Sequence, residues 1–362
     1  MASTPDLIHA SGISLQISTC KTTSPAPRES WQELFKSDNE AIPYQHSAWL
    51  DCMCKTGKYE DVSRLYETSK GRQFLLPLVR RKGFPQALTP AASLPSGWGM
   101  GGLIGTVQAD DVAAVFNDLA RLPFPQITIR PNPRHGEVWA AGAPRNVISI
   151  PRRAHVLDLE GGFDEVWSKR FEKKTRTAVR KAERLGVVVE CDTTGRLIPV
   201  FYDLLRRSLD RWSQQQHEPR LLTHLRGYQR DPLHKFETIA RNLGDACRVW
   251  VAWVNGQPAA SILVLQYGNV NDSRGAMDKE VAATTGANEL IQKLAIEDAC
   301  RAGCRYYHLG ESGNSASLAH YKERFGAVAY PYAEYRLERF PLTRIDGALR
   351  GLVKRAIGFK DV

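Results

Sequence analysis

Apolar and basic side chains follow helical spacing over residues 167–186, WSKRFEKKTRTAVRKAERLG. At 3.6 residues per turn, this spacing gives an apolar stripe on one side and a basic stripe on the opposite side. The apolar stripe consists of Trp167, Phe171, Ala178, Ala182 and Leu185, and the basic stripe of Lys169, Lys173, Arg176, Arg180 and Arg184. The pattern predicts one continuous helix whose apolar stripe faces the core.

One order of elements is predicted twice along the chain. Residues 47–55 form a helix, followed by strands at 61–68 and 73–80. Residues 233–242 again form a helix, followed by strands at 247–254 and 259–267. The dipeptide Asn255-Gly256 between the last two strands is typical of a tight hairpin. The two halves share this order without clear sequence identity.

Further elements complete the second half. A strand at 272–278 is followed by a helix at 288–302, which ends before Gly303, and by a strand at 305–309. Strands mixed with helices in this order predict an α/β (α+β) fold with mixed sheets. We therefore expect an N-terminal unit at residues 1–160, a C-terminal unit at 161–340 and a basic tail at 341–362. The two units should join near residues 153–171.

Two other segments allow alternative interpretations. Residues 85–105 are rich in Pro, Gly and Ser and predict a long loop, with several glycines at 97–102. Those glycines either let the backbone approach a ligand closely or form a structural turn. The tail at 347–362 predicts a short basic amphipathic helix, with Leu349, Leu352, Val353 and Ile357 on one side. It either touches a membrane surface or packs back on the fold.

Positive charge is concentrated in a single segment. The 362 residues include 49 Lys and Arg against 39 Asp and Glu, which gives a formal net charge of +10. Residues 169–184 carry eight of these basic residues and two glutamates, and so supply +6 of that charge. Such a concentration points to an anionic partner, namely nucleic acid, membrane headgroups or a phosphorylated substrate. The alternative is a helix face that is merely solvated.

The composition also limits which cellular compartment and which kinds of cofactor we expect. The seven cysteines are scattered through the chain, which is typical of reduced thiols rather than of a disulfide framework. The N-terminus lacks a secretory pattern, and no apolar run approaches the length of a membrane span. We therefore expect a cytoplasmic protein without a transmembrane segment. No metal or cofactor is expected.

The candidate chemistry lies near the C-terminus, in YYHLGES at 306–312 and HYKERFG at 320–326. Lys322 could polarise a carbonyl or neutralise an oxyanion. His308, Glu311 and Ser312 could transfer protons or position a substrate. Each also has a simpler interpretation, since Lys322 could be a solvated helix residue and His308 a core histidine. Standard hydrolase, zinc-protease and nucleotide-binding motifs are missing.

The order of these segments resembles the FemABX-type aminoacyltransferases and the related GNAT-fold acyltransferases of the cellulose-locus type. The resemblance covers roughly residues 40–340. Its matching pieces are YQHSAWL at 44–50, LPLVR at 76–80, the glycine loop at 97–102, FEKKTRTAVRKAERLG at 171–186, FYDLLRRSLDRW at 201–212, the hairpin around Gly256, TGANELIQKLAIE at 285–297, HLGES at 308–312 and YKERFG at 321–326.

The resemblance implies two tandem GNAT-like domains that transfer an acyl group to an amine. The functional lysine of the family's Lys-x-x-Phe-Gly motif maps onto Lys322. His308 stands where the family often has an acidic residue, so the general base stays open. The catalytic residues expected are Lys322, His308 and Glu311. The substrate-binding residues expected from these pieces are Lys173, Arg176, Arg180, Arg211, Ser312 and Tyr321.

The sequence of one loop bears on which type of acyl donor the protein uses. An acyl-CoA site of the GNAT type has a loop with Arg or Gln and several glycines at a helix N-terminus. Residues 282–287, AATTGA, have one glycine and neither Arg nor Gln. The basic helix favours a larger polyanion, so aminoacyl-tRNA is the preferred donor, with phosphate contacts from Lys173, Arg176 and Arg180. The acceptor would be an amine of a cell-envelope precursor or a small metabolite.

Two alternatives remain. One is an acyl-CoA-dependent N-acyltransferase in polysaccharide or envelope biosynthesis. The other is a non-catalytic GNAT-like module that binds an anion through the basic helix. Salt dependence of tRNA binding, compared with binding of acyl-CoA, separates these cases.

Overall fold

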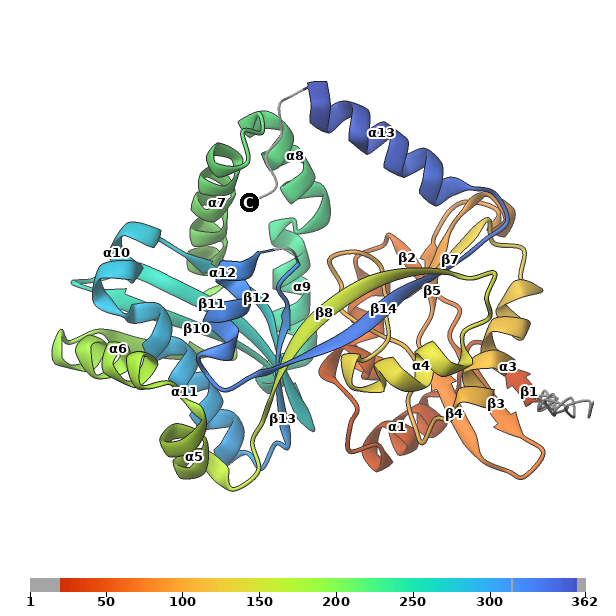
Figure 1. Ribbon diagram of the computed structural model, residues 1–362, viewed down its shortest axis with the longest axis horizontal. Coiled ribbons are helices and arrows are strands. Elements are labelled where there is room, and N and C mark those ends of the chain that lie inside the picture. Colours follow the sequence, from red (N-terminus) through yellow and green to blue (C-terminus); the bar gives the residue numbers. More distant parts are fainter. Residues whose placement is uncertain (1–19, 314, 357–362) are drawn as a thin grey trace, which may run out of the picture.

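The computed structural model describes residues 20–313 and 315–356 of the chain, and Figure 1 shows their arrangement. It confirms an α/β fold with mixed sheets. A three-stranded sheet has the order β1-β3-β4, and an eleven-stranded sheet has the order β2-β5-β6-β7-β14-β8-β13-β12-β11-β10-β9. Helices cover both halves of the large sheet. Among the described residues, no helix combines the length and apolarity needed to cross a bilayer.

The N-terminal half supplies the strands at one end of the large sheet and the whole small sheet. Its elements are β1 (Cys20–Thr23), α1 (Arg28–Ser37), η1 (Pro43–Gln45), α2 (Ser47–Lys55), β2 (Tyr59–Asp61), β3 (Arg64–Thr68), β4 (Gln73–Leu76), β5 (Val79–Arg81), η2 (Gln86–Leu88), β6 (Ala91–Ser93), α3 (Ala109–Ala120), β7 (Gln126–Ile129), η3 (Pro133–His135) and α4 (Gly136–Gly142).

The C-terminal half supplies the strands at the other end. Its elements are β8 (Ile148–Asp158), α5 (Gly162–Glu165), η4 (Val166–Arg170), α6 (Lys173–Arg184), β9 (Val188–Asp192), α7 (Ile198–Gln215), α8 (Arg220–Arg230), α9 (Leu233–Leu243), η5 (Gly244–Ala246), β10 (Cys247–Val254), β11 (Gln257–Tyr267), β12 (Asn269–Met277), α10 (Lys279–Thr285), α11 (Ala287–Arg301), β13 (Tyr306–Glu311), α12 (Ala316–Glu323), β14 (Val328–Glu338) and α13 (Leu342–Ala356).

Two long strands join the halves. β14 pairs antiparallel with β8 from Val328 opposite Val156 to Arg336 opposite Ile148, and its far end pairs with β7. β8 in turn pairs with β13. In Figure 1, β8 and β14 run side by side from the C-terminal half into the N-terminal half. The sheet is therefore continuous across the molecule, and one strand from beyond residue 160 completes the N-terminal half.

The hairpin predicted at Asn255-Gly256 is confirmed. β10 pairs antiparallel with β11, and Asn255 and Gly256 have φ angles of 50° and 74°. Two successive positive φ angles are what a tight turn between twisted strands requires. The helix predicted at 47–55 is also confirmed, because α2 spans Ser47–Lys55. β3 begins at Arg64 rather than at residue 61, because the chain first forms the separate short strand β2.

The single helix predicted over 167–186 is wrong. The chain forms the short α5, one π-helical turn η4 and then α6, with an extended Phe171 (ψ 132°) as the break. This break changes the phase of the stripe, so α6 buries Thr175, Val179 and Ala182, while Leu185 is exposed. Buried Phe171 packs its ring edge-on against Phe325 at 5.1 Å, and this tertiary contact fixes the break.

The segment at 85–105 is more ordered than a loop, because η2 and β6 lie within it. The backbone at its glycines packs closely against other residues of the same chain. A Cβ on Gly99 would come within 2.5 Å of the Tyr44 ring, and one on Gly101 within 2.5 Å of Ser93 Oγ. Close packing within the fold therefore explains these glycines, as the interpretation of a structural turn proposed.

The tail helix starts earlier than predicted. α13 spans Leu342–Ala356, and Ile357 lies outside the described residues. In Figure 1, α13 projects along the upper edge of the molecule, at some distance from the large sheet.

Candidate active site

The large sheet opens between β12 and β13. The two strands run parallel and pair only at Val270 with Tyr307 and at Asn271 with His308. A bulge follows in β13, where Gly310 has a φ of 74°. Beyond these pairs, Asp272 on β12 and Glu311 on β13, which follows the bulge, therefore border an opening in the sheet rather than a ladder of hydrogen bonds.

Asp272 lies on β12 at this opening. Its Oδ1 accepts a hydrogen bond of 2.5 Å from the buried hydroxyl of Tyr307 on β13, and Gln292 Nε2 on α11 donates to the same hydroxyl at 3.1 Å. Burial raises the pKa of Asp272 to about 6, although the Tyr307 hydrogen bond and the charge of Lys322 act in the opposite direction. A carboxyl group with this pKa is ionised at neutral pH and can still accept a proton usefully.

Lys322 lies on α12 and is only 6% exposed, so its interpretation as a solvated helix residue is wrong. Its Nζ donates to the carbonyl oxygens of Gly310 at 2.9 Å and Glu311 at 2.7 Å. Burial lowers the pKa of Lys322 to about 8, while Asp272 and Glu311 favour its charged form. An ammonium has three N–H donors, so one remains for a further acceptor.

Glu311 and Ser312 lie at the end of β13. Glu311 Oε1 accepts a hydrogen bond of 2.5 Å from the Tyr332 hydroxyl, which burial and Glu311 itself keep protonated by raising the tyrosine pKa. Ser312 is buried, and its Oγ has no hydrogen-bond partner among the described residues. The Glu311 carbonyl thus lies next to the Lys322 ammonium, and Ser312 follows it in the chain, while the catalytic role of Glu311 and the binding role of Ser312 stay predictions.

His308 belongs to a different environment. It is 1% exposed, and burial together with the nearby charges of Arg134 and His135 lowers its pKa to about 3. Neither ring nitrogen has a hydrogen-bond partner among the described residues. The imidazole is therefore neutral and faces the N-terminal half, whereas its neighbour Tyr307 faces α11. This placement matches the core-histidine interpretation and leaves Asp272 as the better-placed base.

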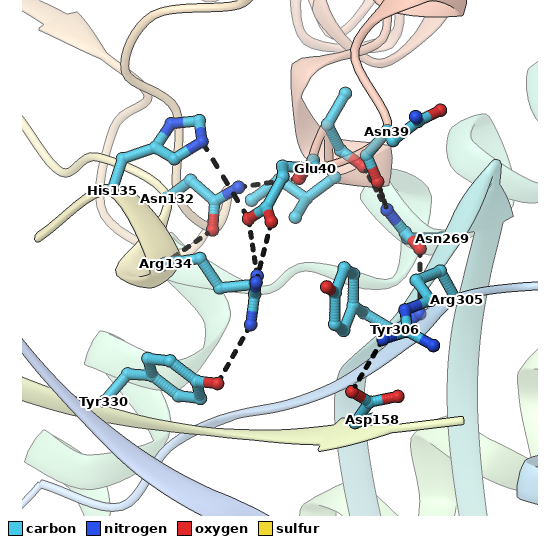
Figure 2. A network of polar contacts seen from close by, with 12 residues as sticks. Asn39, Glu40, Asn132, Arg134, His135, Asp158, Asn269, Arg305, Tyr306 and Tyr330 are labelled. Atoms are coloured by element: carbon cyan, nitrogen blue, oxygen red, sulfur yellow. Dashed lines mark hydrogen bonds and ion pairs between the residues drawn. The ribbon is translucent and has the colours of Figure 1, made fainter. Parts of the chain in front are cut away.

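A polar network next to His308 holds the halves together, as Figure 2 shows. Arg134 donates to both carboxylate oxygens of Glu40, at 2.5 and 2.7 Å, and to the Tyr330 hydroxyl at 2.9 Å. The buried amide of Asn269, at the start of β12, donates to the carbonyls of residues 39 and 41 and accepts from Tyr306 N–H, each at 2.9 Å. The network fastens β12 to β13 at their beginning, so they separate only further along.

Arginines line a large cleft between the two halves. Its volume is about 1090 Å³, and its lining draws on β5, β6, β14, α7, α8 and α13. At its base Glu334 is buried between three arginines, with nitrogen–oxygen distances of 3.3 Å to Arg130, 2.7 Å to Arg152 and 2.6 Å to Arg336. One carboxylate cannot neutralise three guanidinium groups, so the base of the cleft carries net positive charge.

The other predicted substrate-binding residues fall in three different places. Arg211 Nη1 on α7 donates to the Met277 carbonyl at 3.0 Å, at the end of β12. The Tyr321 hydroxyl donates to the Asn288 carbonyl at 3.3 Å, and its ring packs against Phe325 at 5.2 Å in the core. Lys173 and Arg180 are exposed on α6. Their binding roles stay predictions.

Arg176 is held within the fold. Its Nη1 donates at 3.1 Å to the carbonyls of Trp167 and Ser168, and also to that of Phe171, so it caps the π-helical turn. The remaining basic residues of α6 project into solvent. Among the described residues, no ion pair involves the exposed group formed by Lys173, Lys174, Arg180, Lys181 and Arg184.

The N-terminus of α11 is closed. A Cβ on Gly286, just before α11, would come within 2.5 Å of the Ala178 carbonyl oxygen on α6. The first turn of α11 also carries Glu289, 3.5 Å from Arg324. A helix N-terminus binds a pyrophosphate through free N–H groups and positive potential. At the N-terminus of α11, the Ala178 carbonyl oxygen and the Glu289 carboxylate lie close to the backbone instead of an open space for an anion.

Sequence reasoning missed Asp272, Tyr307 and Gln292. Each lies on a predicted strand or helix, but their meeting depends on the parallel pairing of β12 with β13 and on the packing of α11. Their strands, NVNDSRGAM and YYHLGE, contain several other polar residues, so neither Asp272 nor Tyr307 stands out in the sequence.

Comparisons with known proteins agree with this geometry. Residues 169–323 match a family model described as an acetyltransferase (GNAT) domain. A solved structure of FemX aligns with a TM-score of 0.63 at 13% identity, over 90% of this chain and 99% of that one. A conserved protein of unknown function from Bacteroides thetaiotaomicron aligns with a TM-score of 0.54 at 11% identity, over 88% of this chain and 98% of that one.

No curated protein matches the sequence. At such identities the structural likeness concerns the fold, and the family match supplies the chemistry. Residues 169–323 therefore match an acetyltransferase (GNAT) domain, and the chain as a whole shares its fold with the FemX structure.

Proposed function

We propose that this acyltransferase transfers an aminoacyl group from aminoacyl-tRNA to an amine. The observation that carries the proposal is the exposed, unpaired basic face of α6, made by Lys173, Lys174, Arg180, Lys181 and Arg184. Such a face suits a run of phosphates, whose binding releases counterions. The closed N-terminus of α11 supports the proposal further, since it offers little to the pyrophosphate of a CoA donor.

The basic face lies next to the proposed reaction centre. Glu172 N–H, at the start of α6, donates to the Arg324 carbonyl at 2.9 Å, directly after α12. Arg324 Nε in turn donates to Thr175 Oγ1 at 3.2 Å. A tRNA whose phosphates follow α6 would therefore have its acceptor end near the helix that carries Lys322.

Asp272 and Lys322 divide the chemistry between them. In the proposed step the amine attacks the ester carbonyl carbon of the aminoacyl-tRNA, and its proton passes to Asp272. The Lys322 ammonium, with its remaining N–H donor, stabilises the negative oxygen that develops on that carbonyl. An amide bond forms, the ester bond breaks, and the ribose hydroxyl of the tRNA leaves after taking up a proton. The orientation of Lys322 is fixed by the carbonyls of Gly310 and Glu311.

An acyl-CoA donor is the second candidate. It is favoured by the match of residues 169–323 to an acetyltransferase model. In this case the acyl group would come from a thioester, and the same lysine and aspartate would serve. The face of α6 would then be a solvated surface with no influence on donor binding.

One experiment separates the donors. The protein is incubated with a panel of amines and either a pool of radiolabelled aminoacyl-tRNAs or labelled acetyl-CoA, and label transfer to amine is measured. We expect transfer from aminoacyl-tRNA. A K173Q/R180Q/R184Q variant should bind tRNA more weakly, with a log–log salt slope smaller by about 0.7–0.9 for each phosphate that the variant no longer neutralises.

A matched control removes three exposed lysines elsewhere, as K58Q/K70Q/K82Q. It lowers net charge equally and should leave tRNA affinity nearly unchanged. Transfer from acetyl-CoA alone, or equal weakening in both triple variants, would refute the tRNA proposal.

A further inference from the structure

Two helices carry exposed apolar stripes at helical spacing. On α8, Leu221, Leu225 and Tyr228 follow the i, i+4, i+7 pattern and are 83%, 52% and 63% exposed. On α13 the exposed apolar residues are Ile345, Leu349, Leu352 and Val353, each at least half exposed. We call these seven residues the apolar rim. Contiguous exposed apolar patches on a folded chain mark interaction sites.

The two helices that carry the apolar rim also border the arginine-lined cleft. Arg226 and Arg230 of α8, together with Leu342 and Arg350 of α13, line that cleft. In Figure 1, α8 and α13 both lie along the upper edge of the molecule, beyond the end of the large sheet. On α8 the cleft-lining residues Thr223, Arg226, Gly227 and Arg230 lie on the face opposite to Leu221, Leu225 and Tyr228, so the apolar stripe of α8 points away from the cleft. On α13 the apolar stripe lies beside the cleft-lining residues Leu342, Asp346 and Arg350.

The rim is flanked by positive charge. On α13, exposed Arg344, Arg350 and Arg355 accompany the apolar stripe, and Asp346 pairs with Arg350 at 2.9 Å, which leaves Arg344 and Arg355 as flanking positive charge. An amphipathic helix with an apolar face and arginines beside it is typical of a segment that lies in the interface of an anionic membrane. A second copy of this chain would present the same arginines, and like charges would oppose that pairing.

We infer that the apolar rim docks on a membrane that contains anionic lipid. The stripes of α8 and α13 insert at the level of the acyl chains, and the flanking arginines contact lipid phosphates. Because α13 also lines the arginine-lined cleft, docking of its stripe brings that side of the cleft close to the headgroup layer. This inference is independent of the donor.

Vesicle co-sedimentation of the full chain tests it. The vesicles contain either phosphatidylcholine alone or phosphatidylcholine with about a third phosphatidylglycerol. We expect binding to the mixed vesicles only, and weaker binding as salt rises. The variants L349Q/L352Q on α13 and L221Q/L225Q on α8 should each bind at least tenfold more weakly, on the order expected when the insertion of two leucines is removed.

The matched control is L185Q/V188Q, two exposed aliphatic residues beside α6, which are 54% and 63% exposed. It should bind vesicles like the unaltered chain. Equal loss in the control, or no binding to phosphatidylglycerol vesicles, would overturn the inference. So would light scattering that shows a dimer which the rim variants dissociate, because a second copy would then be the occupant. tRNA binding by the rim variants should be unchanged, which separates this test from that of the donor.

Discussion

Replacing Lys322 by methionine removes the charge of this side chain and keeps most of its volume. In the folded chain its pKa is about 8, against 10.5 for an exposed lysine. That difference corresponds to about 3 kcal/mol of penalty on the charged form. The variant removes this penalty and leaves the carbonyls of Gly310 and Glu311 without their donor, which costs about 1–3 kcal/mol for each. We expect the free energy of unfolding at pH 7 to change by less than about 3 kcal/mol.

The activity of the same variant should change far more. If the ammonium stabilises the oxyanion of the transition state, its loss lowers kcat by about 10²–10³. KM for the donor should stay nearly constant, because the donor's phosphates bind elsewhere. The assay is transfer of label from the donor to an amine under single-turnover conditions. Near-normal turnover by well-folded K322M would refute the proposed role of this lysine.

The pH dependence of stability offers an independent readout. Between pH 8 and 10.5 the unfolded chain keeps the Lys322 proton, while the folded chain has released it. The unfolded state therefore binds more protons in this window, and the stability of the unaltered chain rises with pH relative to that of K322M. Urea unfolding of both proteins at several pH values measures the difference. Parallel stability profiles across that window would show that Lys322 is not desolvated.

Three further predictions test the surroundings of the site. In the unaltered chain, kcat/KM should fall below pH 6, where Asp272 gains a proton, and above pH 8, where Lys322 loses one. D272N should abolish the fall on the acid side and most of the rate, and an unchanged acid side in this variant would exclude Asp272 as the general base. N269A should destabilise the fold by about 3 kcal/mol or more in urea unfolding, because two buried hydrogen bonds and a partly buried one are removed. A cost under about 1 kcal/mol would contradict the network in Figure 2. G286A should lower Tm, because a Cβ at a φ of 75° would meet the Ala178 carbonyl oxygen, and an unchanged Tm would argue against this packing of α6 on α11.

Local sequence signals predicted the elements that depend on local physics. The hairpin at Asn255-Gly256 follows from residues that tolerate positive φ, and its strands from alternating apolar runs. The helix at 47–55 and its bounds follow from its apolar periodicity. These elements can be predicted without knowing which distant residues they contact. The same holds for the end of α11 before Gly303, which is a backbone preference of glycine.

The continuous sheet could not be predicted in this way. β14 pairs with β8 and β7, which precede it by about 180 and 210 residues, and no local pattern encodes such pairing. The helix break at Phe171 has a similar origin. Helical propensity favours continuing through this residue, but its ring is buried against Phe325, and Arg176 then satisfies the carbonyls that the break leaves open. A tertiary contact thus overrides the periodicity of the segment.

The candidate site combines residues whose proximity follows from sequence order with a residue that only a long-range strand pairing brings near. Lys322, Glu311 and Ser312 lie close together because they follow one strand and the next helix, so sequence order was enough to predict their proximity. Asp272 precedes them by about 40 residues and joins the site only through the parallel pairing of β12 with β13. Since a base and an oxyanion stabiliser must meet at one carbonyl, the proposed chemistry depends on the long-range contact that the sequence least reveals. If Asp272 and Lys322 act as proposed, the network at Asn269, which holds those two strands together, positions the reacting groups as well as stabilising the fold.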